Sequence, residues 1–123
     1  MNEYTVKVFD DGHKEWYLNG KRHREDGPAI EYADGTKKWY LNGKLHREDG
    51  PAIEKANGTK YWSTNDELHR EDGPAIEKAS GAKEWWINGE EFTEEEFITR
   101  TQTKELTIKE IEELLGFKIK VIG

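Results

Sequence analysis

The feature that most constrains this chain of 123 residues is an internal repeat with a period of 23 residues. The segment HREDGPAIE begins at His23 and recurs from His46 and from His69. The same register aligns four tryptophans, which are Trp16, Trp39, Trp62 and Trp85. Four units are therefore present, of which the first lacks its beginning and the last lacks its end. A period of this length is typical of proteins that stack one supersecondary unit many times.

Each unit has the pattern of short strands joined by tight turns. Residues 52–56 and 59–64 are short runs on either side of Asn57-Gly58, and Asp34-Gly35 stands at the equivalent place one unit earlier. Asn-Gly or Asp-Gly between two such runs favours a type I′ hairpin, in which both turn residues have a positive φ. A second Asn-Gly pair follows the tryptophan in three of the units and reverses the chain again. We predict a mainly β fold, an elongated single-layer meander of antiparallel hairpins over residues 1–91.

The pattern changes in residues 92–123. Thr93–Glu96 and Thr107–Glu110 are capping boxes, in which a threonine hydroxyl and a glutamate three residues later satisfy free amides at the start of a helix. Residues 117–121 then alternate like a strand. We predict a small helix-helix-strand αβ cap that forms one folding unit with the repeats, because a stack of repeats otherwise ends in an uncovered edge.

Composition limits the classes of function. The absence of cysteine excludes disulfides and thiolate metal sites, and no apolar run approaches the length of a membrane span. The net charge is −7 and no basic stripe is present, so nucleic-acid binding is not expected. These features predict a soluble cytoplasmic protein, in the host-cell cytoplasm if it is viral, with no membrane contact and no cofactor.

The histidines of the repeat are candidates for metal binding or acid–base chemistry, since a Glu and an Asp follow each of them. One repeat adds at least two strands, so His23, His46 and His69 should lie about 10 Å or more apart, too far to share a metal. We predict that each imidazole instead bonds a carboxylate or a backbone amide and fastens its turn. Neither serine lies in a nucleophile elbow, and the chain is predicted not to be an enzyme.

Two rows of side chains alternate across the predicted central strands. The tryptophan row recurs in every unit, which favours a place in the sheet's own core. The neighbouring row drifts from tyrosine to serine to tryptophan, which favours contact with a partner. The predicted partner-binding residues are the aromatic members of this second row and two charged residues beside them, namely Tyr17, Tyr40, Trp86, Lys38 and Glu84.

The unit WYLNGKLHREDGPA at residues 39–52 resembles the MORN family of hairpin repeats in its variant form, which has an aromatic-x-x-Asn-Gly-Lys core. The likeness covers residues 12–91, about two thirds of the chain. The HREDGPA version is similar to repeats in small bacteriophage and large-virus proteins. The resemblance implies a long single-layer sheet that serves as a binding surface, in some members for lipids. Pro51 and Ala52 replace the usual aromatic-rich strand start, so we do not expect lipid binding here.

These observations together predict a non-catalytic binding protein whose partner is a host protein. The resemblance implies a bacteriophage factor that binds and inhibits a host or anti-phage defence protein. Two alternatives stay open, namely a nucleotide-binding sponge that uses the repeat turns or the aromatic face, and an acidic mimic of nucleic acid that uses residues 90–113. A homo-oligomer is compatible with each of them.

Overall fold

A computed structural model describes residues 3–102 and 107–116. The chain divides into two compact units, Met1–Phe92 and Thr93–Gly123. The described residues form fourteen strands followed by two short helices, so the predicted mainly β hairpin fold with C-terminal helices is confirmed. The strand predicted for residues 117–121 lies outside the described residues.

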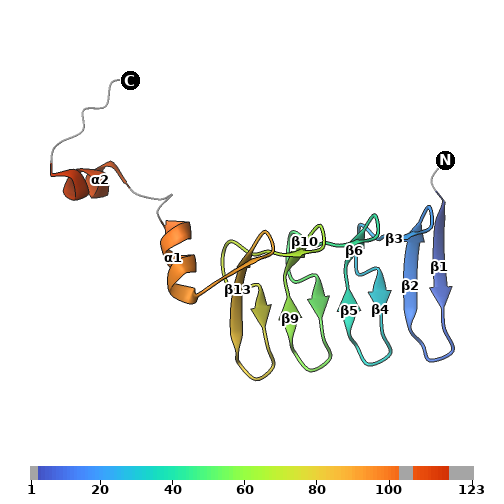
Figure 1. Ribbon diagram of the computed structural model, residues 1–123. Coiled ribbons are helices and arrows are strands. Elements are labelled where there is room, and N and C mark those ends of the chain that lie inside the picture. Colours follow the sequence, from blue (N-terminus) through green and yellow to red (C-terminus); the bar gives the residue numbers. More distant parts are fainter. Residues whose placement is uncertain (1–2, 103–106, 117–123) are drawn as a thin grey trace. The chain divides into compact units, whose positions relative to one another are not determined.

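The first unit is a single layer of antiparallel hairpins placed side by side, one for each repeat (Figure 1). The long sheet has the order β1-β2-β4-β5-β8-β9-β12-β13-β14, and β3 pairs with β2. Its strands are β1 (Tyr4–Val8), β2 (Lys14–Leu18), β3 (Lys21–Arg22), β4 (Ile30–Glu31), β5 (Lys37–Lys38), β8 (Ile53–Glu54), β9 (Lys60–Tyr61), β12 (Ile76–Glu77), β13 (Lys83–Ile87) and β14 (Glu90–Phe92). Two small ladders complete the middle units, pairing β6 (Tyr40–Leu41) with β7 (Lys44–Leu45) and β10 (Ser63–Thr64) with β11 (Glu67–Leu68).

Each repeat has a hairpin turn between its strands and a second turn after its tryptophan, and the first of these differs from the prediction. The type I′ geometry predicted at Asp34-Gly35 and Asn57-Gly58 is wrong, because only the glycine of each pair has a positive φ. The side chain of Asp34 accepts a hydrogen bond from the Thr36 amide at 2.8 Å, an Asx interaction that keeps residue 34 out of the left-handed region. Positive φ at two successive residues occurs instead in the turn after each tryptophan, as at Asn42 (51°) and Gly43 (80°).

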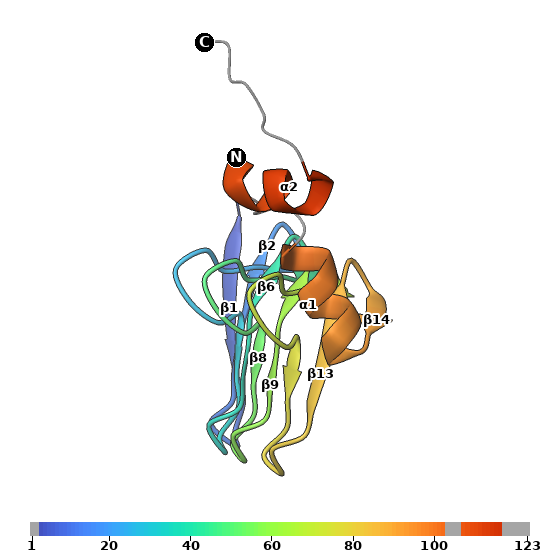
Figure 2. The same ribbon diagram turned by 90° about the vertical axis from the view of Figure 1, so that its left-hand side faces the viewer.

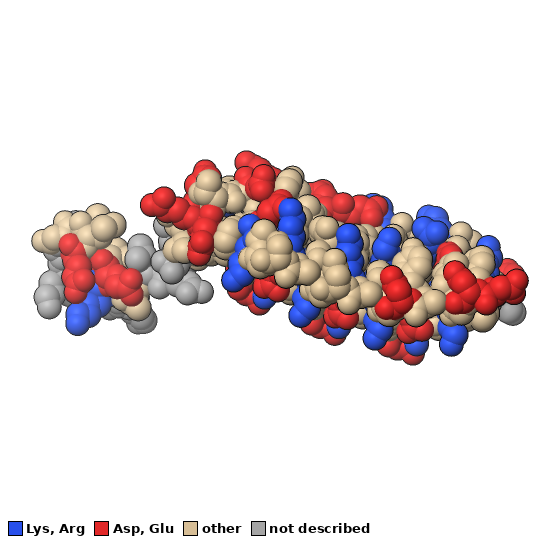
Figure 3. Space-filling model, turned by 90° about the horizontal axis from the view of Figure 1, so that it is seen from below, with Lys and Arg blue, Asp and Glu red and all other residues tan. Residues whose placement is uncertain are grey.

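Charged side chains fix the register of the sheet. The strand pairing aligns lysine with glutamate across every step, in the order Lys14, Glu31, Lys37, Glu54, Lys60, Glu77 and Lys83. Seen from below, basic and acidic side chains are interspersed along the array (Figure 3). Opposite charges directly across a ladder are favourable and like charges are not, so a slip of one strand by one residue would lose this match.

The core of the first unit is thin and is formed mainly by the repeated Ala-Ile pair. Ala29, Ala52 and Ala75 have no exposed surface, and Ile30 and Ile76 are 2% and 6% exposed. The tryptophans are half-buried. Small alanines at the fully enclosed positions let the loop that precedes each short strand lie close to the sheet.

The second unit contains α1 (Glu94–Gln102) and α2 (Ile108–Leu115), and both predicted helix starts are confirmed. The Thr93 amide donates to the Glu96 carboxylate at 3.0 Å, and the Glu96 amide donates to the Thr93 hydroxyl at 3.1 Å. Gly116 ends α2 in the left-handed conformation with φ 76°. Neither described helix is long and apolar enough to cross a membrane. The capping role of this unit stays a prediction.

Candidate functional site

Three loops project from one side of the first unit (Figure 2). They are residues 23–28, 46–51 and 69–74, which we call the repeat loops, and each begins with the His-Arg-Glu-Asp-Gly-Pro motif. Each loop starts where the small upper hairpin of its unit ends and leads into the short strand of the next unit. The repeat therefore places one copy of the motif at the equivalent position of three successive repeats.

Within each repeat loop the arginine folds back onto the tryptophan of its own unit. The Arg47 guanidinium lies 3.9 Å from the centre of the Trp39 ring, its Nε donates to Asp49 at 2.8 Å, and its Nη1 donates to the Pro51 carbonyl at 3.0 Å. Arg24 and Arg70 repeat all three contacts. A guanidinium over an indole ring is a favourable cation–π contact. The motif thus covers Trp16, Trp39 and Trp62 with a guanidinium that is already paired with an aspartate, and the fourth tryptophan of the row, Trp85, precedes no copy of the motif.

The glycine of the motif leaves room for this arginine. A Cβ atom placed on Gly50 would lie 2.9 Å from Cζ of Arg47, and the same position in the other loops gives 3.0 Å at Gly27 and 2.9 Å at Gly73. Any larger residue would push the guanidinium away from the indole. Glycine at this position therefore allows the close approach of the arginine side chain.

Each repeat histidine fastens its loop to the next unit. Nδ1 of His46 accepts a hydrogen bond from the Asn65 amide at 3.1 Å, and His23 and His69 do the same with Asn42 and Asn88, both at 2.9 Å. The opposite ring nitrogen, Nε2, faces the glutamate of the motif, at 3.6 Å for His46. The histidine therefore bonds a backbone amide 19 residues ahead, and among the described residues no group of three or more His, Cys, Asp or Glu could hold a metal ion.

Two grooves separate the three repeat loops. The first groove has a volume of about 740 Å³ and lies between loops 23–28 and 46–51, with Trp39 and Leu41 in its lining. The second groove, of about 800 Å³, lies between loops 46–51 and 69–74 and has Trp62 and Thr64 at the equivalent positions. The array thus presents the same recess twice, one repeat apart.

The groups that the grooves offer to solvent are mainly carboxylates. The side chains of Glu48 and Asp49 are 85% and 86% exposed, whereas that of Arg47 is 21% exposed. The hydrogen bond from Arg47 lowers the pKa of Asp49, and Arg70 lowers the pKa of Asp72 in the same way. Both aspartates therefore stay ionised at neutral pH and give each groove an acidic rim.

The partner was expected on the row that contains Tyr17, Tyr40 and Trp86. None of these three residues lines either groove. Arg22 lies over the Tyr40 ring at 5.7 Å, Lys7 lies over Tyr17 at 4.7 Å, and the indole nitrogen of Trp86 donates to Glu84 at 3.3 Å. Lys38 lies 5.4 Å above the ring of Tyr32 rather than beside Tyr40. The grooves lie on the tryptophan face, because the repeat loops rise from that face and form their walls.

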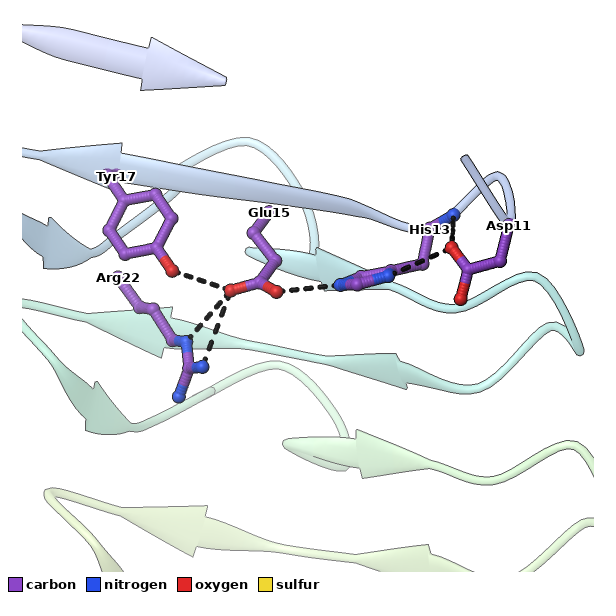
Figure 4. A network of polar contacts seen from close by, with 5 residues as sticks. All are labelled: Asp11, His13, Glu15, Tyr17 and Arg22. Carbon is purple, nitrogen blue, oxygen red and sulfur yellow. Dashed lines mark hydrogen bonds and ion pairs between the residues drawn. The ribbon is translucent and has the colours of Figure 1, made fainter. Parts of the chain in front are cut away.

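A polar network in the first unit was missed by the sequence reasoning (Figure 4). Glu15 is only 8% exposed, and its carboxylate accepts a hydrogen bond from the Tyr17 hydroxyl at 2.6 Å and lies 2.7 Å from Nε2 of His13. The Tyr17 bond, followed by the His13 bond, lowers the pKa of Glu15, while Glu15 raises the pKa of His13. Asp11 contacts the other ring nitrogen at 3.1 Å. The signal was a spacing of two residues, which places Glu15 and Tyr17 on one face of β2, while His13 and Asp11 approach from the turn that precedes the strand.

The geometry of the grooves favours a cationic ligand over an anion or a metal. Nε and Nη1 of each loop arginine already donate to protein acceptors, and Nδ1 of each loop histidine already accepts a backbone amide. The acceptors that the arginines leave available are the exposed Glu side chains and the second carboxylate oxygen of each Asp, beside an indole. A comparison with known protein families, curated proteins and solved structures finds no match for this chain, so these grooves carry the functional inference.

Proposed function

We propose that this chain is a non-catalytic binding protein whose two grooves take basic side chains from an extended segment of a partner protein. The observation that carries the proposal is the repetition of one acidic recess with an indole in its lining. A lysine or arginine side chain can lay its methylenes against Trp62 and direct its charge between the carboxylates of successive loops.

The glutamate of the motif supports this role. Glu48 and Glu71 are strongly exposed and lie 3.6 Å and 3.9 Å from their histidines, too far for a hydrogen bond, whereas Glu25 lies 3.3 Å from His23 and bonds it. Nevertheless glutamate stands at this position in all three loops, whereas another exposed position holds Lys21, Lys44 and Glu67 in successive units. Because the bond to the histidine is missing in two of the three loops, we attribute the recurrence of the glutamate to a shared ligand.

The repeat spacing sets the pattern that the partner should have. Each unit adds two strands to the long sheet, so equivalent points of the two grooves lie about 10 Å apart. A polyproline II segment rises about 3.1 Å per residue with three residues per turn, so basic residues three positions apart project from the same side and would enter both grooves. Engagement of two weak sites by one segment raises the overall affinity well above that of either site.

The partner that we propose is a host protein, which can be an anti-phage defence protein. Binding would inhibit this partner. This part of the proposal rests on the resemblance to repeats of bacteriophage and large-virus proteins. A nucleotide sponge is less well supported, since the arginines that would hold a phosphate are engaged by Asp and Pro acceptors.

The test is fluorescence anisotropy of the full chain with a labelled extended peptide that carries lysine at every third position. We expect saturable binding that weakens with salt, and a loss of roughly tenfold or more in the variant Glu48→Gln/Glu71→Gln. The control Glu67→Gln/Glu90→Gln makes the same change of charge at two exposed sites outside the groove linings. Equal binding by the double variant, or binding of nucleotides in place of the peptide, would refute the proposal.

A further inference from the structure

The first strand of the array is an apolar edge. Among the described residues β1 pairs only with β2, so one of its sides has no ladder partner. Tyr4, Val6 and Val8 alternate along it and are 59%, 49% and 67% exposed. The β2 residue across from Val6 is Trp16, so this apolar row lies on the tryptophan face.

The backbone of the same three residues points to the free side. The Glu3 carbonyl accepts from Asn19, and the Phe9 amide donates to His13, so the flanking odd-numbered residues bond towards β2. Hydrogen-bonding direction alternates along an antiparallel strand. The amides and carbonyls of Tyr4, Val6 and Val8 are therefore directed outward, ready to pair with another strand.

This edge lacks the protection that edge strands usually carry. Natural edges are blunted by charged side chains, proline or bulges. Lys7, the one charged residue of β1, lies over the Tyr17 ring on the opposite face from Val6. At the other end of the sheet, β14 carries Glu90 and Glu91, so that edge is protected by charge.

From these observations we infer that β1 is a self-association site, at which a second copy of this chain adds its own β1 in antiparallel orientation. Along β1, Val6 has an apolar or aromatic residue two positions away on either side. Pairing centred there sets Val6 against Val6 and Tyr4 against Val8, so apolar residues meet across the whole face. Lys7 meets Thr5 and no like charges oppose each other. The two-fold pairing closes after two chains, so the product is a dimer.

This inference is independent of the groove proposal and has a direct test, because the chain contains no cysteine. In the two-fold pairing the Cα atoms of the two Val6 residues lie about 5.5 Å apart, within reach of a disulfide. Mild oxidation of Val6→Cys should therefore give a covalent dimer. Val8→Cys is the matched control and should cross-link at least tenfold more slowly, since its neighbour in the pairing is Tyr4.

Sedimentation of the full chain over a range of concentrations supplies the second measurement. We expect a monomer–dimer equilibrium that Val6→Lys shifts to monomer and that Glu91→Lys, at the opposite edge, leaves unchanged. Thermal unfolding of Val6→Lys checks that this variant is folded. The two cysteine variants test the strand pairing independently of Val6→Lys. A monomer at every concentration, an open-ended polymer, or equal cross-linking of the two cysteine variants would each overturn the inference.

Discussion

Replacement of one motif glycine, Gly50→Ala, should destabilise the protein by displacing an arginine. The added Cβ would lie 2.9 Å from Cζ of Arg47, so the guanidinium has to leave its place over Trp39. Gly50 is not among the glycines with a positive φ, so alanine itself should fit the backbone. The expected cost is therefore the loss of the arginine's contacts.

The size of the effect follows from four contacts of Arg47, with Trp39, Pro51, Asp49 and Glu54. The cation–π contact with Trp39 is worth about 0.5 to 2 kcal/mol. The hydrogen bond to Pro51 adds about 1 kcal/mol. The contact with the half-buried Glu54, at 3.3 Å, adds less than about 1 kcal/mol, and the ion pair with the exposed Asp49 adds little because solvent screens it. Release of the side chain returns up to about 2 kcal/mol of rotamer entropy, so we expect a net loss of about 1 to 2 kcal/mol in the free energy of unfolding.

Urea denaturation of a double-mutant cycle tests this reasoning. Gly50→Ala should lower the unfolding midpoint in the wild-type background, and it should be neutral or slightly stabilising in the Arg47→Ala background, where the added methyl group meets nothing. If Gly50→Ala costs the same in both backgrounds, the glycine is needed for its backbone and the steric argument is refuted.

Three further variants probe other contacts. His46→Ala removes the acceptor of the Asn65 amide and should lower the free energy of unfolding by about 1 kcal/mol or more in urea denaturation, and an unchanged midpoint would contradict the fastening role. Because Glu15 raises the pKa of His13, the stabilisation from that contact is present below the ordinary histidine value and is lost as the pH rises through the raised one. The melting temperature of the wild type should therefore exceed that of His13→Gln more at pH 6 than at pH 9, and a constant difference would rule this out. Trp62→Ala should weaken binding of the lysine peptide more than Tyr40→Ala, measured by anisotropy, and the reverse order would return the binding surface to the tyrosine face.

Much of the fold could be predicted from the sequence because the signals are local. The period of the repeat, the Gly punctuation and the two capping boxes each act within a few residues. The turn at Asp34-Gly35 was misjudged because the same dipeptide fits two turn types. The hydrogen bond from Thr36 to Asp34 decides between them, and it depends on a residue that lies outside the dipeptide.

The candidate site was harder to predict because it depends on the path of a loop. The pattern showed that tryptophan recurs, and recurrence was interpreted as burial in the core. The arginine eight residues later covers each indole only because the loop folds back over the sheet, with Gly50 allowing the close approach. The walls of the grooves belong to two different repeats. Alternation along a single strand therefore could not reveal which face is recessed.

The bond from each histidine to the following unit has a consequence for how the chain folds. His46 reaches Asn65, only 19 residues ahead, and the strand ladders likewise join neighbouring units. Contacts of short sequence separation lower the contact order, and β proteins owe their usual slowness to pairings between distant segments. We expect the first unit to form quickly for an all-β chain, starting from any two adjacent repeats and growing outward one hairpin at a time.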